Sequence, residues 1–178
     1  SIYYQAEIAR KRGRLGQAAT LYDTYLKSPA RDVNNIMKAH FNYAQVSSRL
    51  GRVTKTKEGY QRTIATYQAF KRQGKEAGVQ YAAEARFILA QEGLQRIRAI
   101  RFTANDRQQA KAAQEMKALR ERYIVEMKDV IRFDYGPMIV AALASSGQMF
   151  DYIASTLSRI PVPSGFNADE GKQYKELI

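Results

Sequence analysis

The chain has 178 residues, with 29 Lys and Arg against 17 Asp and Glu, so its formal net charge at pH 7 is +12. No cysteine and only one histidine are present, which excludes disulfides, thiolate nucleophiles, cysteine-bound metals and clusters of histidine ligands. With 45% hydrophobic residues, the composition indicates one globular domain with one core and no bound metal or other cofactor.

Four helices are predicted within the segment 1–74, because glycine and proline interrupt the helix-forming sequence at regular points. Gly13 and Gly51 each separate two helices, Pro29 ends the second helix, and Gly74 follows the fourth. Asp32 is a favourable N-cap for the third helix. The predicted helices span residues 2–12, 15–27, 32–51 and 53–72.

Residues 75–178 predict longer helices, at 75–100, 105–130, 136–160 and 167–178. Asn105 or Thr103 caps the second of these, and the Gly136-Pro137 pair begins the third, which is apolar enough to be buried between neighbours. No segment alternates apolar and polar residues long enough to form a strand, so the sequence predicts an all-α fold. Because the chain starts and stops abruptly, we expect a fragment of a longer protein.

A repeat relates the first two predicted hairpins, and it appears when the sequence is aligned with itself from Ala6 onto Ala44. A small residue in the first helix lets the second approach closely, glycine makes the turn, and the second helix inserts a tyrosine and an aliphatic residue one turn apart. The repeated tyrosines are therefore expected in the core. The matched positions are Ala6 and Ala44, Gly13 and Gly51, Arg14 and Arg52, Leu15 and Val53, Tyr22 and Tyr60, and Leu26 and Ile64.

The first hairpin resembles the tetratricopeptide repeat (TPR), and residues 40–64 are a looser copy. The resemblance is carried by Ala6, Gly13, Leu15, Ala18, Tyr22 and Pro29. The spacing of the two copies is longer than the roughly 34 residues of a TPR, and Ser47 and Thr56 stand where small apolar residues are usual. The resemblance implies a TPR-like helical-hairpin solenoid, one domain over 1–178 with two hairpins in 1–74 and longer helices in 75–178. An unrelated antiparallel bundle is the alternative.

Residues 80–178 resemble the C-terminal part of large TPR proteins of gliding and predatory deltaproteobacteria. The similarity lies in an Ala-Ala-Glu-Ala-Arg-Phe helix at 82–87, a long charged helix, an Ala-Ala-Leu helix at 141–143 and a Pro-Val-Pro turn at 161–163. The tryptophan often seen before the Ala-Ala pair in those proteins is lacking. The resemblance implies a non-enzymatic scaffold in the periplasm or otherwise associated with the cell envelope, with a cytoplasmic location as the alternative.

Positive charge is concentrated in the segment 1–75, which carries +11 of the net +12. Basic residues crowd both predicted repeat turns, at 10–14 and 49–57, and stacked repeats would make these turns neighbours. We expect an acidic protein or peptide as the partner. Anionic lipid head groups, nucleic-acid phosphates and a surface that only aids solubility are the alternatives. The longest apolar run, 138–144, is far shorter than the roughly 20 residues that cross a bilayer, so no transmembrane segment is expected.

A TPR-like arrangement would line a concave groove with residues of the first and third helices, including Tyr3 and Glu7. Lys38 and Asn42 lie one helical turn apart and are similar to the Lys/Asn pairs that clamp a C-terminal carboxylate in some TPR co-chaperones. Ammonium and amide groups at such positions grip a peptide through its backbone and carboxylate. The candidate partner-binding residues of the turns and groove are Arg10, Lys11, Arg14, Lys38, Phe41, Asn42, Gln45, Arg49, Arg52 and Lys55.

No motif points to catalysis, and we expect the protein not to be an enzyme. His40 has no second His or Cys for a catalytic pair, and the segment 13–16 is too short for a phosphate-binding loop. Acids of the sixth predicted helix are spaced to form surface ion pairs, namely Lys111–Glu115, Lys117–Glu121 and Arg122–Glu126. The sequence therefore predicts a protein–protein interaction scaffold of TPR type with a basic N-terminal half. A helical nucleic-acid-binding protein is the alternative.

Overall fold

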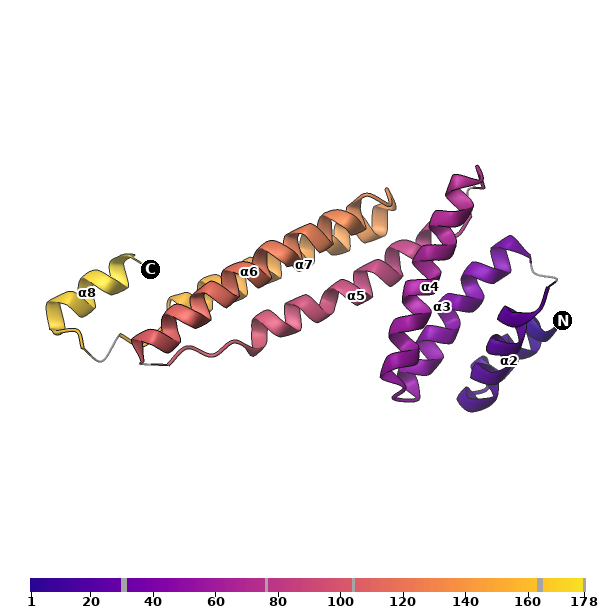
Figure 1. The fold of residues 1–178 in the computed structure, drawn as a ribbon, viewed down its shortest axis with the longest axis horizontal. Helices are drawn as coiled ribbons and strands as arrows, with labels where there is room; N and C mark the ends of the chain where they lie inside the picture. Colours follow the sequence, from indigo (N-terminus) through magenta and orange to yellow (C-terminus); the bar gives the residue numbers. More distant parts are fainter. Residues whose placement is uncertain (30–31, 76, 104, 163–164, 178) are drawn as a thin grey trace. The chain divides into compact units, whose positions relative to one another are not determined.

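The computed structural model describes residues 1–29, 32–75, 77–103, 105–162 and 165–177, and every regular element within these ranges is an α-helix (Figure 1). The predicted all-α fold is therefore confirmed. The helices are α1 (Ile2–Lys11), α2 (Leu15–Lys27), α3 (Val33–Arg49), α4 (Val53–Arg72), α5 (Val79–Ala99), α6 (Asp106–Ile131), α7 (Gly136–Leu157) and α8 (Ala168–Leu177).

The helix ends follow from local capping. The carboxylate of Asp32 accepts a hydrogen bond of 3.2 Å from the backbone N–H of Asn35 at the start of α3. The side chain of Asn105 accepts one of 3.0 Å from the N–H of Gln108, so Asn105 rather than Thr103 caps α6. One start differs: α5 begins at Val79 rather than at the predicted position 75, and Gly78 just before it has a φ of 79°, which is not helical.

The described chain divides into two compact units, each treated separately below. The first contains Ser1–Leu89 and Val130–Met138, and the second contains Ala90–Asp129 and Ile139–Ile178. The sequence predicts one domain with a change of helix length at residue 74. The division between the two units lies within α5, because the first half of this helix packs with α3 and α4 while its second half packs with α6 and α7.

In the first unit, the turn between α1 and α2 has the same backbone geometry as the turn between α3 and α4. Gly13 has a φ of 73° and Gly51 a φ of 69°, a left-handed conformation that favours glycine. The N–H of Arg14 bonds to the carbonyl of Ala9, and the N–H of Arg52 bonds to the carbonyl of Ser47, both at 2.9 Å. The two turns of the sequence repeat therefore share the same pattern of backbone hydrogen bonds.

Burial repeats with the same period. Ala6 and Ala44 are fully buried, and the equivalent residues Tyr22 and Tyr60 are also in the core. Gly59 lies where α4 crosses α3 most closely, since a Cβ at this position would stand 2.7 Å from the Cβ of Ala44. The expected role of these repeated tyrosines in packing is confirmed for Tyr22 and Tyr60.

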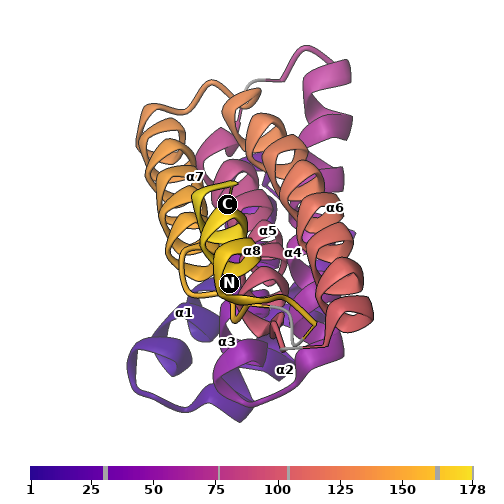
Figure 2. The same cartoon turned by 90° about the vertical axis from the view of Figure 1, so that its left-hand side faces the viewer.

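The second unit has a three-helix core formed by the end of α5 with α6 and α7, which lie side by side in Figures 1 and 2. Its largest buried side chains include Leu94, Met127 and Met149. A polar cluster links all three helices: the hydroxyls of Tyr123 and Ser145 are 2.6 Å apart, and the Gln91 amide donates to them at 3.2 and 3.0 Å. Helix contacts in this unit are therefore both apolar and hydrogen-bonded.

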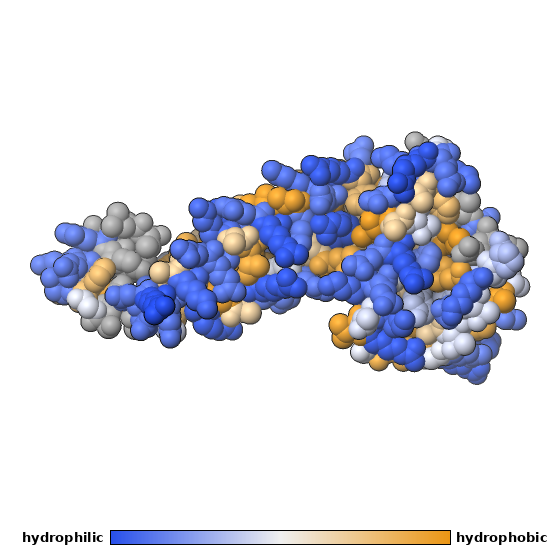
Figure 3. Space-filling view, in the orientation of Figure 1, coloured by the Kyte–Doolittle hydropathy of each residue, from blue (hydrophilic) through white to orange (hydrophobic). Residues whose placement is uncertain are grey.

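Helix α7 buries only one of its faces, so the expectation that it lies buried between neighbours is wrong. Ala142 and Met149 are buried, whereas Val140, Leu143 and Phe150 on the other side are 49–68% exposed. On the face shown in Figure 3, hydrophobic side chains form small areas between hydrophilic ones. No helix of the described ranges combines the length and apolar character needed to span a membrane.

Candidate interaction sites

A buried acid, Glu7 on α1, lies between α1, α2 and α3 and is 9% exposed. Its oxygens accept hydrogen bonds from the Tyr22 hydroxyl of α2, from the Asn42 amide of α3 at 2.7 Å and from the Arg10 guanidinium at 3.1 Å. The ammonium of Lys38 on α3 stands 4.0 Å away. One acid of the first helix therefore joins three helices.

Burial alone would raise the pKa of Glu7, since it disfavours the charged form. The hydrogen bonds from Tyr22, Arg10 and Asn42 together outweigh burial, and the net effect is a pKa below the ordinary value of 4.5. The Tyr22 hydroxyl shows the complementary effect: burial, followed by the bond to Glu7, raises its pKa strongly. Glu7 is thus a stable anion that fills a site made of donors.

The Lys38–Asn42 pair predicted to clamp a partner's carboxylate faces a carboxylate of its own chain. Asn42 is 5% exposed and bonded to Glu7, and Arg10 is bonded to both Glu7 and Tyr22. Phe41 is 4% exposed and packs against the rings of Tyr60 and Tyr81. Among the predicted groove residues, Arg10, Phe41 and Asn42 therefore make contacts within the chain.

The basic residues of the two repeat turns are differently placed. Lys11, Arg14, Arg49 and Arg52 are exposed, and none of their side chains forms a hydrogen bond or an ion pair with another described residue. Lys55 is also exposed and pairs with Glu58 at 3.2 Å. Because consecutive helices of this unit pack as hairpins, both turns lie at the same end of it, as Figures 1 and 2 show.

A cavity of about 190 Å³ lies between α2, α3 and α4, beside the second basic turn. Two ion pairs stand in its walls, Asp23 with Lys27 at 2.6 Å on α2 and Lys55 with Glu58 on α4. The sequence did not reveal this hollow, because its lining comes from three separate helices. The other residues around it are Leu26, His40, Tyr43, Gly59 and Arg62.

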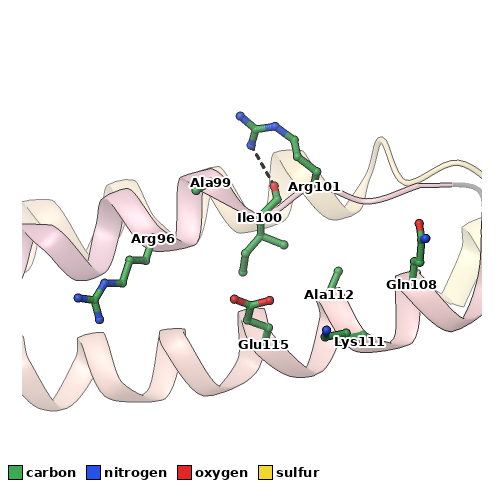
Figure 4. Close-up of a pocket in the computed structure, with 8 residues that line it drawn as sticks. All are labelled: Arg96, Ala99, Ile100, Arg101, Gln108, Lys111, Ala112 and Glu115. Atoms are coloured by element: carbon green, nitrogen blue, oxygen red, sulfur yellow. Dashed lines mark hydrogen bonds between the residues drawn. The ribbon is translucent and has the colours of Figure 1, made fainter.

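A second, larger cavity of about 350 Å³ lies in the second unit between the end of α5 and the start of α6 (Figure 4). The sequence did not indicate this cavity because the positive and negative charges of residues 76–178 nearly cancel. The informative signal was local: five basic residues and one acid fall within residues 96–111. The cavity is lined by Arg96, Ala99, Ile100, Arg101, Gln108, Lys111, Ala112 and Glu115.

The acids and bases of α6 pair less than their spacing predicts. Arg122 and Glu126 form the expected ion pair at 3.3 Å. Lys111 and Glu115 are both exposed, and neither is paired within the described part of the chain. These two charges are therefore available at the wall of the α5–α6 cavity.

Comparison of the chain with protein-family models, with curated proteins and with solved structures found no match. The TPR resemblance stays a prediction. In the described ranges, no group of three or more His, Asp or Glu side chains is arranged to hold a metal ion. The remaining candidate sites are the two basic turns and the cavities lined by charged side chains.

Proposed function

We propose that the protein is a non-enzymatic scaffold of TPR type that binds an acidic protein or peptide through the basic end of its first unit. The observation that carries the proposal is the pair of equivalent turns, both at one end of the unit. Together they present Lys11, Arg14, Arg49 and Arg52 as exposed cations that no described residue neutralises. Unpaired surface charge of one sign attracts an oppositely charged partner and raises its rate of association.

The interior of the first unit supports placing the contact at the turns. A carboxylate from a partner would have to displace Glu7 to reach the buried amide of Asn42, and Glu7 is anchored by Tyr22 and Arg10 as well. A buried charge with several hydrogen bonds is costly to expose without its partners. At the turns, a partner's carboxylate can meet exposed cations without the loss of a buried hydrogen bond.

Charge reversal at one turn tests the proposal. We expect the triple variant R49E/R52E/K55E to weaken binding of a fluorescein-labelled Glu-rich peptide about tenfold or more at low ionic strength, with a shallower dependence on salt. Fluorescence anisotropy measures the affinity, and circular dichroism checks that helicity is unchanged. The acidic peptide stands in for the partner.

A matched control separates local contact from total charge. The variant K71E/R72E/K75E changes the net charge equally at and just beyond the C-terminal end of α4, away from the turn at its N-terminal end, and we expect a much smaller loss of affinity. Equal weakening by both variants would contradict binding at the turns. If labelled RNA instead binds at micromolar affinity with a steep salt slope, the protein is a nucleic-acid-binding protein and the proposal fails.

From the resemblance of residues 80–178, we further propose a periplasmic or envelope-associated location. Cell fractionation of the tagged full-length protein tests this, with recovery in the cytoplasmic fraction as the contrary result.

A further inference from the structure

The cavity between α5 and α6 combines an apolar floor with unpaired charge at its rim. Ile100 is 8% and Ala112 7% exposed, and their side chains face each other across the two helices (Figure 4). The volume of about 350 Å³ accommodates one or two side chains of a partner rather than an entire element. Occupation of the hollow would remove apolar surface from water, which favours binding.

Two cations at this cavity remain available to an anion. Lys111 is exposed, and its side chain makes no ion pair or hydrogen bond within the described residues. Among the described residues, Arg96 pairs with Glu92 alone, on its own helix at 3.8 Å, and its side chain is 53% exposed. An exposed pair of this kind contributes little stability, so Arg96 can exchange it for another anion at little cost.

Arg101 has a different role. Its guanidinium donates a hydrogen bond of 2.6 Å to the carbonyl of Arg98. It donates another of 3.0 Å to the carbonyl of Ile100 (Figure 4). These carbonyls belong to the end of α5, where the helix dipole concentrates negative charge. Arg101 therefore holds the end of the helix and the position of Ile100, and it is a positioning residue for the cavity.

Glu115 limits the kind of anion that fits. Its carboxylate projects from α6 toward α5 beneath Ile100 in Figure 4, and no described residue pairs with it. Glu115 repels any anion bound beside it, and a closely spaced series of phosphates brings more negative charge against it than a single carboxylate at Lys111 and Arg96 does. Glu115 can accept a hydrogen bond from a peptide N–H or a basic group next to that carboxylate.

We propose that this cavity binds a short acidic segment of the protein partner that carries an aliphatic side chain next to a carboxylate. The aliphatic group lies on Ile100 and Ala112, and the carboxylate meets Lys111 and Arg96. This inference rests on the proposed function, because it assigns a second contact to the same acidic partner. It adds a requirement that the basic turns do not impose: an apolar residue at a fixed place in the acidic segment.

The test uses the full chain and two labelled peptides, one with repeated Leu-Asp pairs and one in which each Leu is Ala. We expect the Leu-Asp peptide to bind about tenfold more tightly. Lys111→Glu should remove most of that difference, whereas Lys117→Glu should keep it. Lys117 is the matched control because it is also an exposed lysine of α6 whose side chain pairs with no described residue.

A second variant tests the hollow without a change in charge. Ala99 is exposed and lines the cavity, so Ala99→Trp should block it and abolish the preference for Leu, with unchanged helicity. In amide NMR spectra of the wild type, the Leu-Asp peptide should shift the signals of Ile100 and Ala112.

The outcomes separate the two ideas. If R49E/R52E/K55E weakens binding of both peptides while Lys111→Glu and Ala99→Trp leave the preference for Leu intact, the proposed function stands and the cavity inference is wrong. If neither peptide binds, both are wrong. If RNA shifts the same amide signals and the peptides do not, the assignment of an acidic peptide to the cavity is overturned.

Discussion

The side-chain amide of Asn42 donates a hydrogen bond of 2.7 Å to the carboxylate of Glu7, which lies 35 residues earlier in the chain. The bond ties α3 to α1, and the same carboxylate is bonded to Tyr22 of α2. Glu7 is buried and charged, so each donor offsets part of the cost of removing the anion from water. The stability of the first unit should therefore depend on these polar contacts as well as on its apolar core.

Substitution of Asn42 by Ala should destabilise the first unit by about 1–3 kcal/mol, because it leaves a buried carboxylate with one donor fewer. Urea denaturation followed by circular dichroism measures the change. Gln45→Ala, one turn later on the same helix, is the control: Gln45 is partly exposed and its side chain makes no hydrogen bond with the described residues, so its loss should cost less than about 0.5 kcal/mol. Equal effects would show that the Glu7 contact contributes nothing specific.

The pH dependence of stability should report the lowered pKa of Glu7. A carboxylate with a lower pKa in the folded than in the unfolded state stabilises the fold above its unfolded value, near 4.5, and this contribution is lost as pH falls through the folded value. The wild type should exceed Glu7→Gln in unfolding free energy by about 2 kcal/mol at neutral pH, with a shrinking difference below pH 4.5.

Glu58→Gln is the control for this pH series, since Glu58 forms a surface pair with Lys55 and its side chain is 43% exposed. We expect it to differ from the wild type by less than about 0.5 kcal/mol over the same pH range. A constant difference between wild type and Glu7→Gln from neutral to acid pH would contradict the assigned role of the Glu7 charge.

Helix positions and the hairpin repeat were predictable because they depend on local signals. Gly13 and Gly51 end their hairpin turns through a backbone conformation that glycine favours, and Asp32 and Asn105 cap their helices through nearby N–H groups. Each signal acts within a few residues. These local signals can therefore be recognised in a single sequence without knowledge of the tertiary structure.

The interaction sites were less predictable because they depend on contacts between distant segments. Spacing placed Lys38 and Asn42 on one face of a helix. Only the packing of α1 on α3 shows that both side chains face the carboxylate of Glu7. The α5–α6 cavity was hidden by the balanced charge of the second half. Lys111 was assigned to an ion pair with Glu115 that the structure does not form.

Gly59→Ala should destabilise the first unit even though alanine favours helices. The new Cβ would stand 2.7 Å from the Cβ and 3.0 Å from the Cα of Ala44, so α3 and α4 would have to separate. Overpacking typically costs about 1–3 kcal/mol, and the gain in helix propensity, about 1 kcal/mol, offsets only part of it. Gly147→Ala on α7 has no atom within 4 Å of its Cβ and should instead be stabilising. Thermal unfolding of both variants gives the comparison.

The polar cluster of the second unit should behave as one coupled group. Tyr123 is fully buried and Ser145 is 6% exposed, and their hydroxyls, 2.6 Å apart, share the amide of Gln91. Tyr123→Phe should cost about 1–2 kcal/mol by removing these bonds without changing the packed ring.

A double-mutant cycle with Ser145→Ala measures the coupling, which we expect to exceed about 0.5 kcal/mol because the two residues are in direct contact. The single changes leave Gln91 with one hydroxyl partner, whereas the double change leaves its amide with neither of the two, so the energies should not add. Tyr4→Phe, at a tyrosine that is 61% exposed, is the control and should be nearly neutral. Strictly additive effects of Tyr123→Phe and Ser145→Ala would mean that the hydroxyl contact does not stabilise the three-helix core.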